Sequence, residues 1–369
     1  MNMMIGSTIS SSWPGGFWWH WLVFSIIIVA VVFLVLIVIT FSERRVLGFM
    51  QARRGPNRTG PFGSFQIIAD AIKALLKEDI IPDKADKLIF WLAPVVAFFP
   101  VLLIFAVIPF QDGAMLADLN IGLLYILAIS SISVIGIFMA GWASNNKYSL
   151  LGAMRSIAAV VSYEIPVVLS IVGVVLLTGS MSLNQIVIAQ HIPFILLQPL
   201  GFLLFFIGGC AEISRSPFDL LEADQEIVAG HHTEYSGMKF ILFFLVEYAE
   251  ALALSAIIAT IFLAGWKGPG LPPWLWLLIK VLGVYFVLIW TRATLPRVRI
   301  DQLMALAWKF LLPLSLINLF ITALEVLAWP DGLPWLAVPL NLAIMAALVL
   351  LWSRFFKMGW GRVEVRQLR

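Results

Sequence analysis

Nine long apolar runs separated by shorter polar segments dominate the hydropathy pattern of the chain. Each run approaches the roughly twenty residues that a helix needs to cross a lipid bilayer. The pattern predicts membrane-spanning helices at 18–41, 88–109, 121–143, 156–178, 192–213, 239–264, 274–292, 310–328 and 335–353. No internal repeat or long linker divides these runs, so we expect a single membrane domain over residues 1–369.

The segment between the first two runs has a different pattern. Gly-Pro pairs interrupt it at 55–61, and from Ser64 onward apolar residues recur every three or four positions, opposite Asp70, Lys73 and Lys77. This spacing is typical of an amphipathic helix that lies in the membrane interface. Such a helix either anchors the chain or frames an opening from the lipid into the protein. The predicted fold is therefore an all-α polytopic membrane protein, with about nine transmembrane helices and an interfacial amphipathic helix in the first cytoplasmic loop.

The composition agrees with this class. Hydrophobic residues make up 61% of the 369 and charged residues 12%, which excludes a soluble domain. The single cysteine, Cys210, excludes an internal disulfide and an iron–sulfur cluster that this chain alone would ligate. The N-terminus has no basic residues before its first apolar run, so we expect a retained helix and not a cleaved signal.

Lysine and arginine are distributed unevenly between the two sets of loops. Of the 24, all but Lys267 and Lys280 lie in the loops after the odd-numbered runs, at the borders of those loops, or in the C-terminal tail. Cytoplasmic loops carry the excess of Lys and Arg. The distribution therefore predicts an odd number of spans, with the N-terminus outside and the C-terminus in the cytoplasm.

The segment from Glu212 to Tyr235 is unusually acidic for a cytoplasmic loop. Against a single cation, Arg215, it carries six carboxylates: Glu212, Asp219, Glu222, Asp224, Glu226 and Glu234. Two compatible interpretations are a docking surface for a soluble partner and the mouth of a proton path. The adjacent His231 and His232 are able to titrate near neutrality.

Charged residues fall inside apolar runs, among them Glu164, Glu247, Glu250 and Lys280. An ionised group inside a bilayer costs several kcal/mol, so such residues indicate function by default. At about 1.5 Å per residue, Glu164 and Glu247 lie at similar depths below the cytoplasmic ends of their helices, and Lys280 lies deeper. We interpret them as a proton or ion path that descends from the acidic loop. The alternative is a set of buried ion pairs that hold helices together.

Several stretches resemble the H subunit of respiratory complex I, which is NuoH in bacteria and NADH dehydrogenase subunit 1 in mitochondria. They are ERRVLGFMQARRGPN, GPFGSFQIIADAIKALLKED, GWASNNKYSLLGAMRS with SYEIP, AEISRSPFDLLEADQEIVAGHHTEYSGMKF, and TRATLPRVRIDQLMALAWKFLLP. The resemblance implies a proton-pumping NADH:quinone oxidoreductase of the bacterial plasma membrane. This subunit would have no redox centre of its own and would hold the membrane part of the quinone tunnel.

The resemblance also implies partners and substrates. The substrate would be a quinone, either ubiquinone or menaquinone, dissolved in the lipid bilayer. NAD, FMN and iron–sulfur clusters would lie only in partner subunits. The partners would be the other membrane subunits of complex I, together with the quinone-site and iron–sulfur subunits of its peripheral arm; no nucleic acid and no metal site are implied.

Individual residues can be matched to the family's motifs. The acidic chain that links the tunnel to proton translocation is matched by Glu43, Glu164, Glu212, Asp219, Glu222, Glu226, Glu234 and Glu247, and Lys280 matches a lysine of several bacterial members. Positions beside the quinone access are matched by Arg44, Asp70, Ala71 and Lys73. Leu221 stands where proline is usual and His231 where an aromatic residue is usual, whereas Glu250 matches no family position.

Two other functions remain open from the sequence. Related subunits occur in membrane-bound hydrogenase-type complexes, where similar helices couple hydrogen evolution to ion movement without quinone. A free-standing ion transporter is the second alternative, although the long interfacial loop favours the quinone enzyme.

Overall fold

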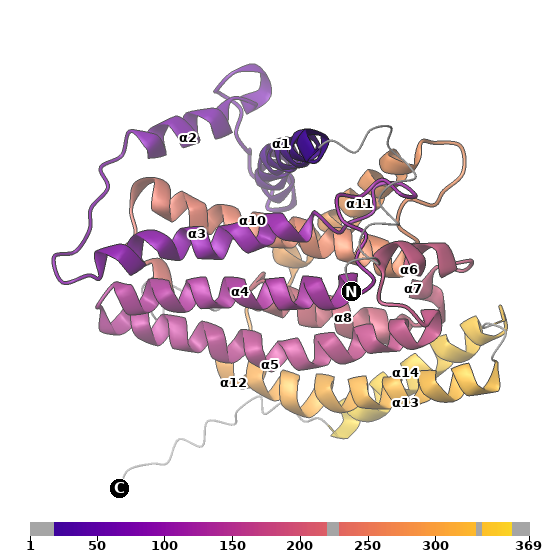
Figure 1. The fold of residues 1–369 in the computed structure, drawn as a ribbon. Helices are drawn as coiled ribbons and strands as arrows, with labels where there is room; N and C mark the ends of the chain where they lie inside the picture. The colour runs from indigo at the N-terminus through magenta and orange to yellow at the C-terminus, as the bar shows by residue number, and fades with distance from the viewer. Residues whose placement is uncertain (1–17, 220–228, 330–333, 356–369) are drawn as a thin grey trace, which may run out of the picture.

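Long apolar helices run side by side through the computed structural model, which describes residues 18–219, 229–329 and 334–355 (Figure 1). Among these residues, eight helical segments are long and apolar enough to cross a membrane, and no strand is formed. They are α1 (Trp18–Met50), α3 (Lys87–Ile104), α4 (Gly122–Ala143), α5 (Lys147–Thr178), α10 (Gly237–Phe262), α11 (Pro273–Thr294), the continuous α12, η3 and α13 (Ile300–Ala305, Leu306–Leu311 and Leu312–Ala328), and α14 (Ala337–Phe355). The all-α polytopic class is confirmed.

The predicted helix over 192–213 is broken. It consists of α7 (Phe194–Leu197) and α8 (Pro199–Glu212), preceded by the short α6 (Leu183–Ala189). At the junction Gln198 has φ −127° and ψ 61°, outside the helical region, and Pro199 has no N–H to continue the helical ladder. α8 has 14 residues, and at about 1.5 Å per residue it is shorter than the roughly 30 Å hydrocarbon core.

Two helices extend further toward the basic end of the bundle than the apolar pattern predicts. α1 continues past residue 41 to Met50, and α5 begins at Lys147 instead of residue 156. The start of α5 is capped by the Asn146 side chain, which accepts a hydrogen bond from the Tyr148 N–H at 3.0 Å. As a result Glu43 and Arg44, which the apolar pattern placed in a loop, lie on the rigid α1.

The predicted amphipathic helix is present as α2 (Gln66–Leu75), after the single turn η1 (Pro61–Gly63). Figure 1 shows α2 beside α1 and set apart from the bundle of α3, α4 and α5. Ala74 is buried, whereas Ile68, Ile72 and Leu75 are each more than half exposed. An apolar face left open next to a bilayer is what an interfacial helix presents to lipid.

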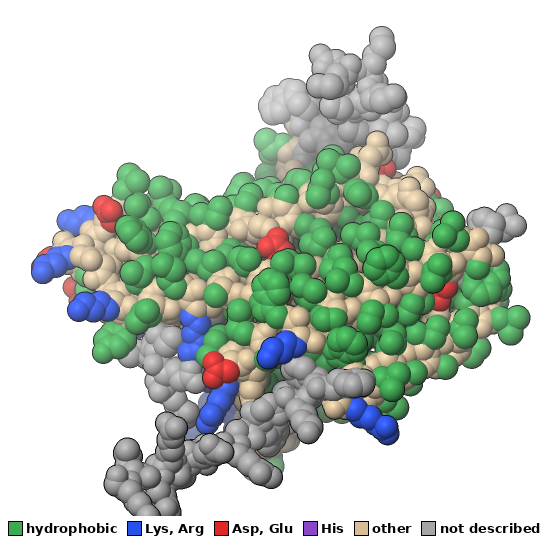
Figure 2. All heavy atoms as spheres, turned by 90° about the horizontal axis from the view of Figure 1, so that it is seen from below, with side chains coloured by type: hydrophobic (Ala, Val, Ile, Leu, Met, Phe, Trp, Pro, Cys, Tyr) green, Lys and Arg blue, Asp and Glu red, His purple; other side chains and the backbone are tan. Residues whose placement is uncertain are grey.

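Small residues allow the other helices to approach closely. A side chain on Gly136 of α4 would lie 2.6 Å from the backbone nitrogen of Ala97 on α3, and one on Gly152 of α5 would lie 2.7 Å from Gly230. Such contacts are typical of helices that pack within lipid. Hydrophobic side chains cover most of the face seen in Figure 2, and several Lys and Arg gather at the end where α3 and α5 begin.

Candidate functional site

A buried group of ion pairs joins α1, α10 and α11 to the segment after α8. The Glu43 carboxylate of α1 accepts hydrogen bonds from Arg215 at 2.7 Å, from Arg292 at 2.6 Å and from the Tyr285 hydroxyl at 2.7 Å. Arg215 also lies 3.1 Å from the Glu247 carboxylate of α10. Glu43 and Arg215 are 1% and 2% exposed, so these charges are held by one another instead of by water.

Arg215 does not have the surface position that its loop suggests. Its guanidinium lies between Glu43 and Glu247 and stacks 4.7 Å from the centre of the Tyr248 ring. Burial opposes the charged form, but Glu43 and Glu247 outweigh it and raise the pKa of Arg215 above its usual range. The residue is therefore a permanent internal cation and not part of an exposed docking surface.

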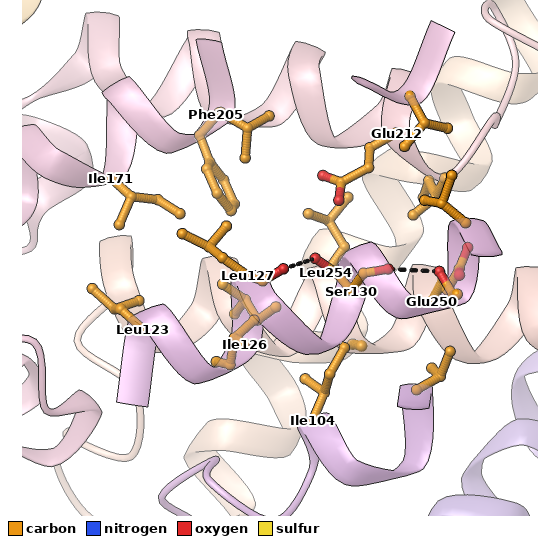
Figure 3. Close-up of a pocket in the computed structure, with 18 of the residues that line it drawn as sticks. Ile104, Leu123, Ile126, Leu127, Ser130, Ile171, Phe205, Glu212, Glu250 and Leu254 are labelled. Atoms are coloured by element: carbon orange, nitrogen blue, oxygen red, sulfur yellow. Dashed lines mark hydrogen bonds between the residues drawn. The ribbon is translucent and has the colours of Figure 1, made fainter. Parts of the chain in front are cut away.

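A cavity lies between α3, α4, α5, α8 and α10 (Figure 3). Its volume is about 70 Å³. About 10–15 Å³ suffices for one water molecule, so the cavity has room for several. Most of its wall is apolar, and Phe205 and Ile171 lie at one end (Figure 3). At the other end Glu212 of α8 points inward and Glu250 of α10 lies close by.

Hydroxyl groups of α4 accompany the acids around this cavity. Ser130 interacts with Glu212, and Ser133 interacts with Glu250. Ser131 donates a hydrogen bond to Glu164 of α5. Polar partners of this kind are what buried carboxylates require inside a low-dielectric protein.

The acids around the cavity and those of the ion-pair group form one electrostatic series. Glu212 interacts with Glu164, and Glu250 interacts with both Glu212 and Glu247. Because Glu247 and Glu250 lie three positions apart on α10, they occupy one side of that helix. Glu250, which matched no motif, therefore connects the two groups.

Lys280 lies elsewhere. Its ammonium donates to the backbone carbonyls of Gly265 at 2.8 Å and Lys267 at 2.7 Å, in the connection between α10 and α11. None of the ion pairs among the described residues includes Lys280. The expectation that it forms the deep end of the acidic series is wrong, because its side chain extends toward the opposite end of α10. A Glu164–Lys280 ion pair is not formed either.

The described part of the acidic loop is held to its neighbours. Asp219 pairs with Arg297 at 3.0 Å, and Glu234 accepts a hydrogen bond from Asn146 at 2.6 Å. These contacts connect the loop to the basic ends of α11 and α5. Glu222 and Glu226 lie outside the described residues.

His231 does not titrate near neutrality. It is buried in the turn η2 (Gly230–His232), and its ring packs edge-on against Phe243 at 5.3 Å. Burial, with a smaller contribution from His232, lowers the pKa of His231 to about 3. Its Nδ1 atom has no hydrogen-bond partner among the described residues.

A polar network ties α2 to α1. Arg44 of α1 forms an ion pair with Asp70, which also accepts a hydrogen bond from Gln66 at 2.9 Å. Burial opposes ionisation of Asp70, but the hydrogen bonds from Arg44 and Gln66 outweigh it and lower the pKa of this carboxyl. The remaining predicted positions of this region, Ala71 and Lys73, are exposed on α2. Lys73, three positions after Asp70, also lowers the pKa of that carboxyl through its positive charge.

Several residues of the site were not predicted. In the apolar pattern Arg292 is only the last residue of a run, and no sequence motif singles out Tyr285. Seven positions, or about two helical turns, separate them, so both lie on one side of α11. This spacing of two polar residues could have been recognised in the sequence. The cluster Ser130, Ser131 and Ser133 inside an apolar run is a second such signal.

Comparisons with known proteins agree on one family. A family profile described as NADH dehydrogenase matches residues 23–323. The H subunit of NADH-quinone oxidoreductase from Dehalococcoides mccartyi strain CBDB1 is 63% identical over 350 residues, which cover 95% of this chain and 99% of that relative. The corresponding H subunit from Bacillus mycoides strain KBAB4 is 50% identical over 316 residues, which cover 83% of this chain and 95% of that relative.

Proposed function

Because the chain belongs to the family of NADH-quinone oxidoreductase H subunits and is thus a membrane subunit of complex I, we propose that it forms the membrane part of the quinone path and couples quinone reduction to proton translocation. The quinone, ubiquinone or menaquinone, is the substrate. Electrons reach it from an iron–sulfur cluster of the peripheral arm, and NAD and FMN are bound by partner subunits. The acidic loop faces that arm.

One observation carries the proposal: neighbouring residues of α1 belong to the two networks. Arg44 pairs with Asp70 of the amphipathic helix, and Glu43 pairs with Arg215 of the acidic series. Adjacent residues of one helix thus connect α2 to Glu43. Such a contiguous network is a physical route by which a change at α2 can reach the acidic series.

The quinone path has its support in α2. Its apolar side is open, and its polar side carries the Arg44–Asp70 pair. A quinone has an apolar tail and a polar headgroup, so such a helix can guide the tail from lipid while ion pairs stay on the protein side.

The proton path has its support in the series Glu247, Glu250, Glu212 and Glu164 and in the cavity beside them. Carboxylates and hydroxyls bridged by water are the groups that relay protons within membranes. The ion-pair interpretation of Glu164 loses support, because its partner is the hydroxyl of Ser131 and not a cation.

The experiment is Glu164→Gln in the complete complex reconstituted into vesicles. The amide keeps the size of the side chain but cannot exchange a proton, so we expect normal assembly and thermal stability together with loss of proton pumping. Glu78→Gln, at an exposed acid of the same end of the bundle, is the matched control and should pump normally.

Both stability and pumping are measured on the same sample. A Glu164→Gln complex that melts at a lower temperature but pumps normally per assembled complex would contradict the proton path and favour a purely structural carboxylate.

A further inference from the structure

A second buried polar cluster lies at the break between α7 and α8, where α13 and α14 pack against it. Its members are Gln198, Asn318, Thr322, Glu325 and Asn341. Each is less than 8% exposed. The positions 318, 322 and 325 are spaced by four and three residues, so they share one side of α13. No part of the proposed quinone or proton path uses these residues.

The hydrogen bonds fix which way the amides point. Asn341 Nδ2 donates to the carbonyl of Leu197 at 2.6 Å. Because a carbonyl only accepts, the nitrogen must face Leu197, and Oδ1 is the end of the amide that does not. Gln198 Nε2 donates to the Thr322 hydroxyl at 2.9 Å, and that hydroxyl donates to the carbonyl of Asn318 at 2.8 Å. The contact with a carbonyl, which only accepts, assigns the amide of Asn341, and in this arrangement the Thr322 hydroxyl serves Gln198 as acceptor.

This assignment leaves too many acceptors. Asn341 Oδ1, Gln198 Oε1 and Glu325 Oε1 are buried without a donor among the described residues, whereas the only orphan donor in this cluster is Asn318 Nδ2. The second Glu325 oxygen lies 3.4 Å from Asn341 Nδ2. Buried oxygen atoms that lack donors cost free energy unless a positive group lies between them.

The charge of the cluster is also uncompensated. Residues 310–353 contain no Lys, Arg or His, and no ion pair among the described residues includes Glu325. A buried carboxylate without a counter-charge is costly in a low-dielectric interior. The described part of the chain supplies no positive charge beside Glu325.

We propose that Glu325 and Asn341 bind a monovalent metal cation of the Na⁺ type beside the broken helix. Hard oxygen ligands without sulfur or imidazole select such ions, and a single carboxylate matches a single charge. The Leu197 carbonyl at the break is already bonded by the Asn341 amide N–H, so the carboxylate and the amide oxygen are the ligands that remain.

The test counts radioactive Na⁺ bound to the purified complex in detergent, with choline chloride holding the ionic strength constant. Glu325→Gln should bind one Na⁺ fewer per complex than the unmodified protein. Ser315→Ala is the matched control: this serine is buried on the same helix, and its hydroxyl donates to the Leu312 carbonyl of that helix at 2.8 Å. It should bind as many ions as the unmodified protein.

A second variant keeps the proposal testable if Glu325→Gln fails to assemble. Asn341→Leu preserves the volume and the carboxylate but removes the amide oxygen, and it should weaken Na⁺ binding by about tenfold or more. Equal Na⁺ binding in the unmodified protein and in the assembled variants would overturn the proposal, and would mean that a proton on Glu325 supplies the missing charge. Quinone reduction is not needed for this measurement, so its outcome is independent of the quinone path.

Discussion

Arg215 and Arg297 show how burial decides what one ion pair contributes. Arg215 is 2% exposed and neutralises two acids, whereas the side chain of Arg297 is 54% exposed and faces Asp219. Removing one partner of a buried pair typically costs about 3–5 kcal/mol because the remaining charge stays buried. An exposed pair contributes at most about 1 kcal/mol.

We therefore predict that Arg215→Gln strongly lowers the thermal stability of this chain in the complex. The remaining acids, Glu43 and Glu247, would lie in one buried place with only Arg292 to oppose them. Arg297→Gln should shift the unfolding midpoint by a small fraction of that amount. Thermal unfolding of this chain in the complex measures both shifts. Similar shifts for the two variants would contradict the ion-pair role assigned to Arg215.

His231 gives a prediction about pH. Its pKa is about 3 in the folded chain against an ordinary value of 6.5, so only the unfolded chain takes up this proton between those values. Stability therefore falls as the pH drops below about 6.5. At pH 5.5 the loss from this residue is about 1 kcal/mol.

His231→Phe should remove this loss. Phenylalanine can keep the edge contact with Phe243 and does not need a partner for a ring nitrogen. The unfolding midpoint of the variant should decrease less between pH 7.5 and 5.5 than that of the unmodified protein. His191→Gln, at an exposed histidine, is the control. An identical pH dependence of His231→Phe and the unmodified protein would refute the argument.

At the scale of elements, α2 places little of its surface in the core. One small side chain, Ala74, is buried along its length, and the contact with α1 is the partly exposed Arg44–Asp70 pair. Such an element can carry a bulky substitution without disturbing the packing of the bundle.

Ala71→Trp uses this property. Because Ala71 is exposed on α2 next to Asp70, an indole fits without entering the core, and we expect the complex to assemble. If the quinone path runs along this helix, quinone reduction should fall at least several-fold while electron transfer from NADH to an artificial acceptor at the flavin remains normal.

The matched control is Glu78→Trp, which adds an indole at an exposed polar position beyond the end of α2. It should leave both activities unchanged. Unchanged quinone reduction in an assembled Ala71→Trp complex would show that α2 does not line the path.

For the whole molecule, the distribution of charge predicts the orientation. Lys77 lies at the basic end of the bundle, whereas Lys267 lies in the α10–α11 connection at the opposite end, where it donates to the carbonyls of Ile188 and Gln190. The positive-inside rule then places Lys77 in the cytoplasm and Lys267 outside.

Single cysteines test this orientation in intact cells. A membrane-impermeant maleimide should label Lys267→Cys and should label Lys77→Cys only after the membrane is opened. The native Cys210 is buried and gives little background. Labelling of Lys77→Cys from outside would reverse the orientation.

The sequence by itself determined the class of the molecule and most of its elements. A long apolar run predicts a membrane helix, because a helix satisfies its own backbone hydrogen bonds and leaves no unpaired backbone group facing lipid. The three- and four-residue spacing after Ser64 was sufficient for α2. The motifs were sufficient for the family. The acids inside apolar runs, Glu164, Glu247 and Glu250, could be identified because charge is rare in such runs.

Only the tertiary structure decided which charges meet. Position along the sequence placed Lys280 with the acids, but its long side chain reaches carbonyls of the connection between α10 and α11. Arg215 belongs by sequence to an acidic loop, but partners from α1 and α10 bury it. Glu250 became the link between two groups, and Glu325 an acid without a counter-charge, because long-range packing sets the neighbours of a buried group. Local pattern contains no information about those neighbours.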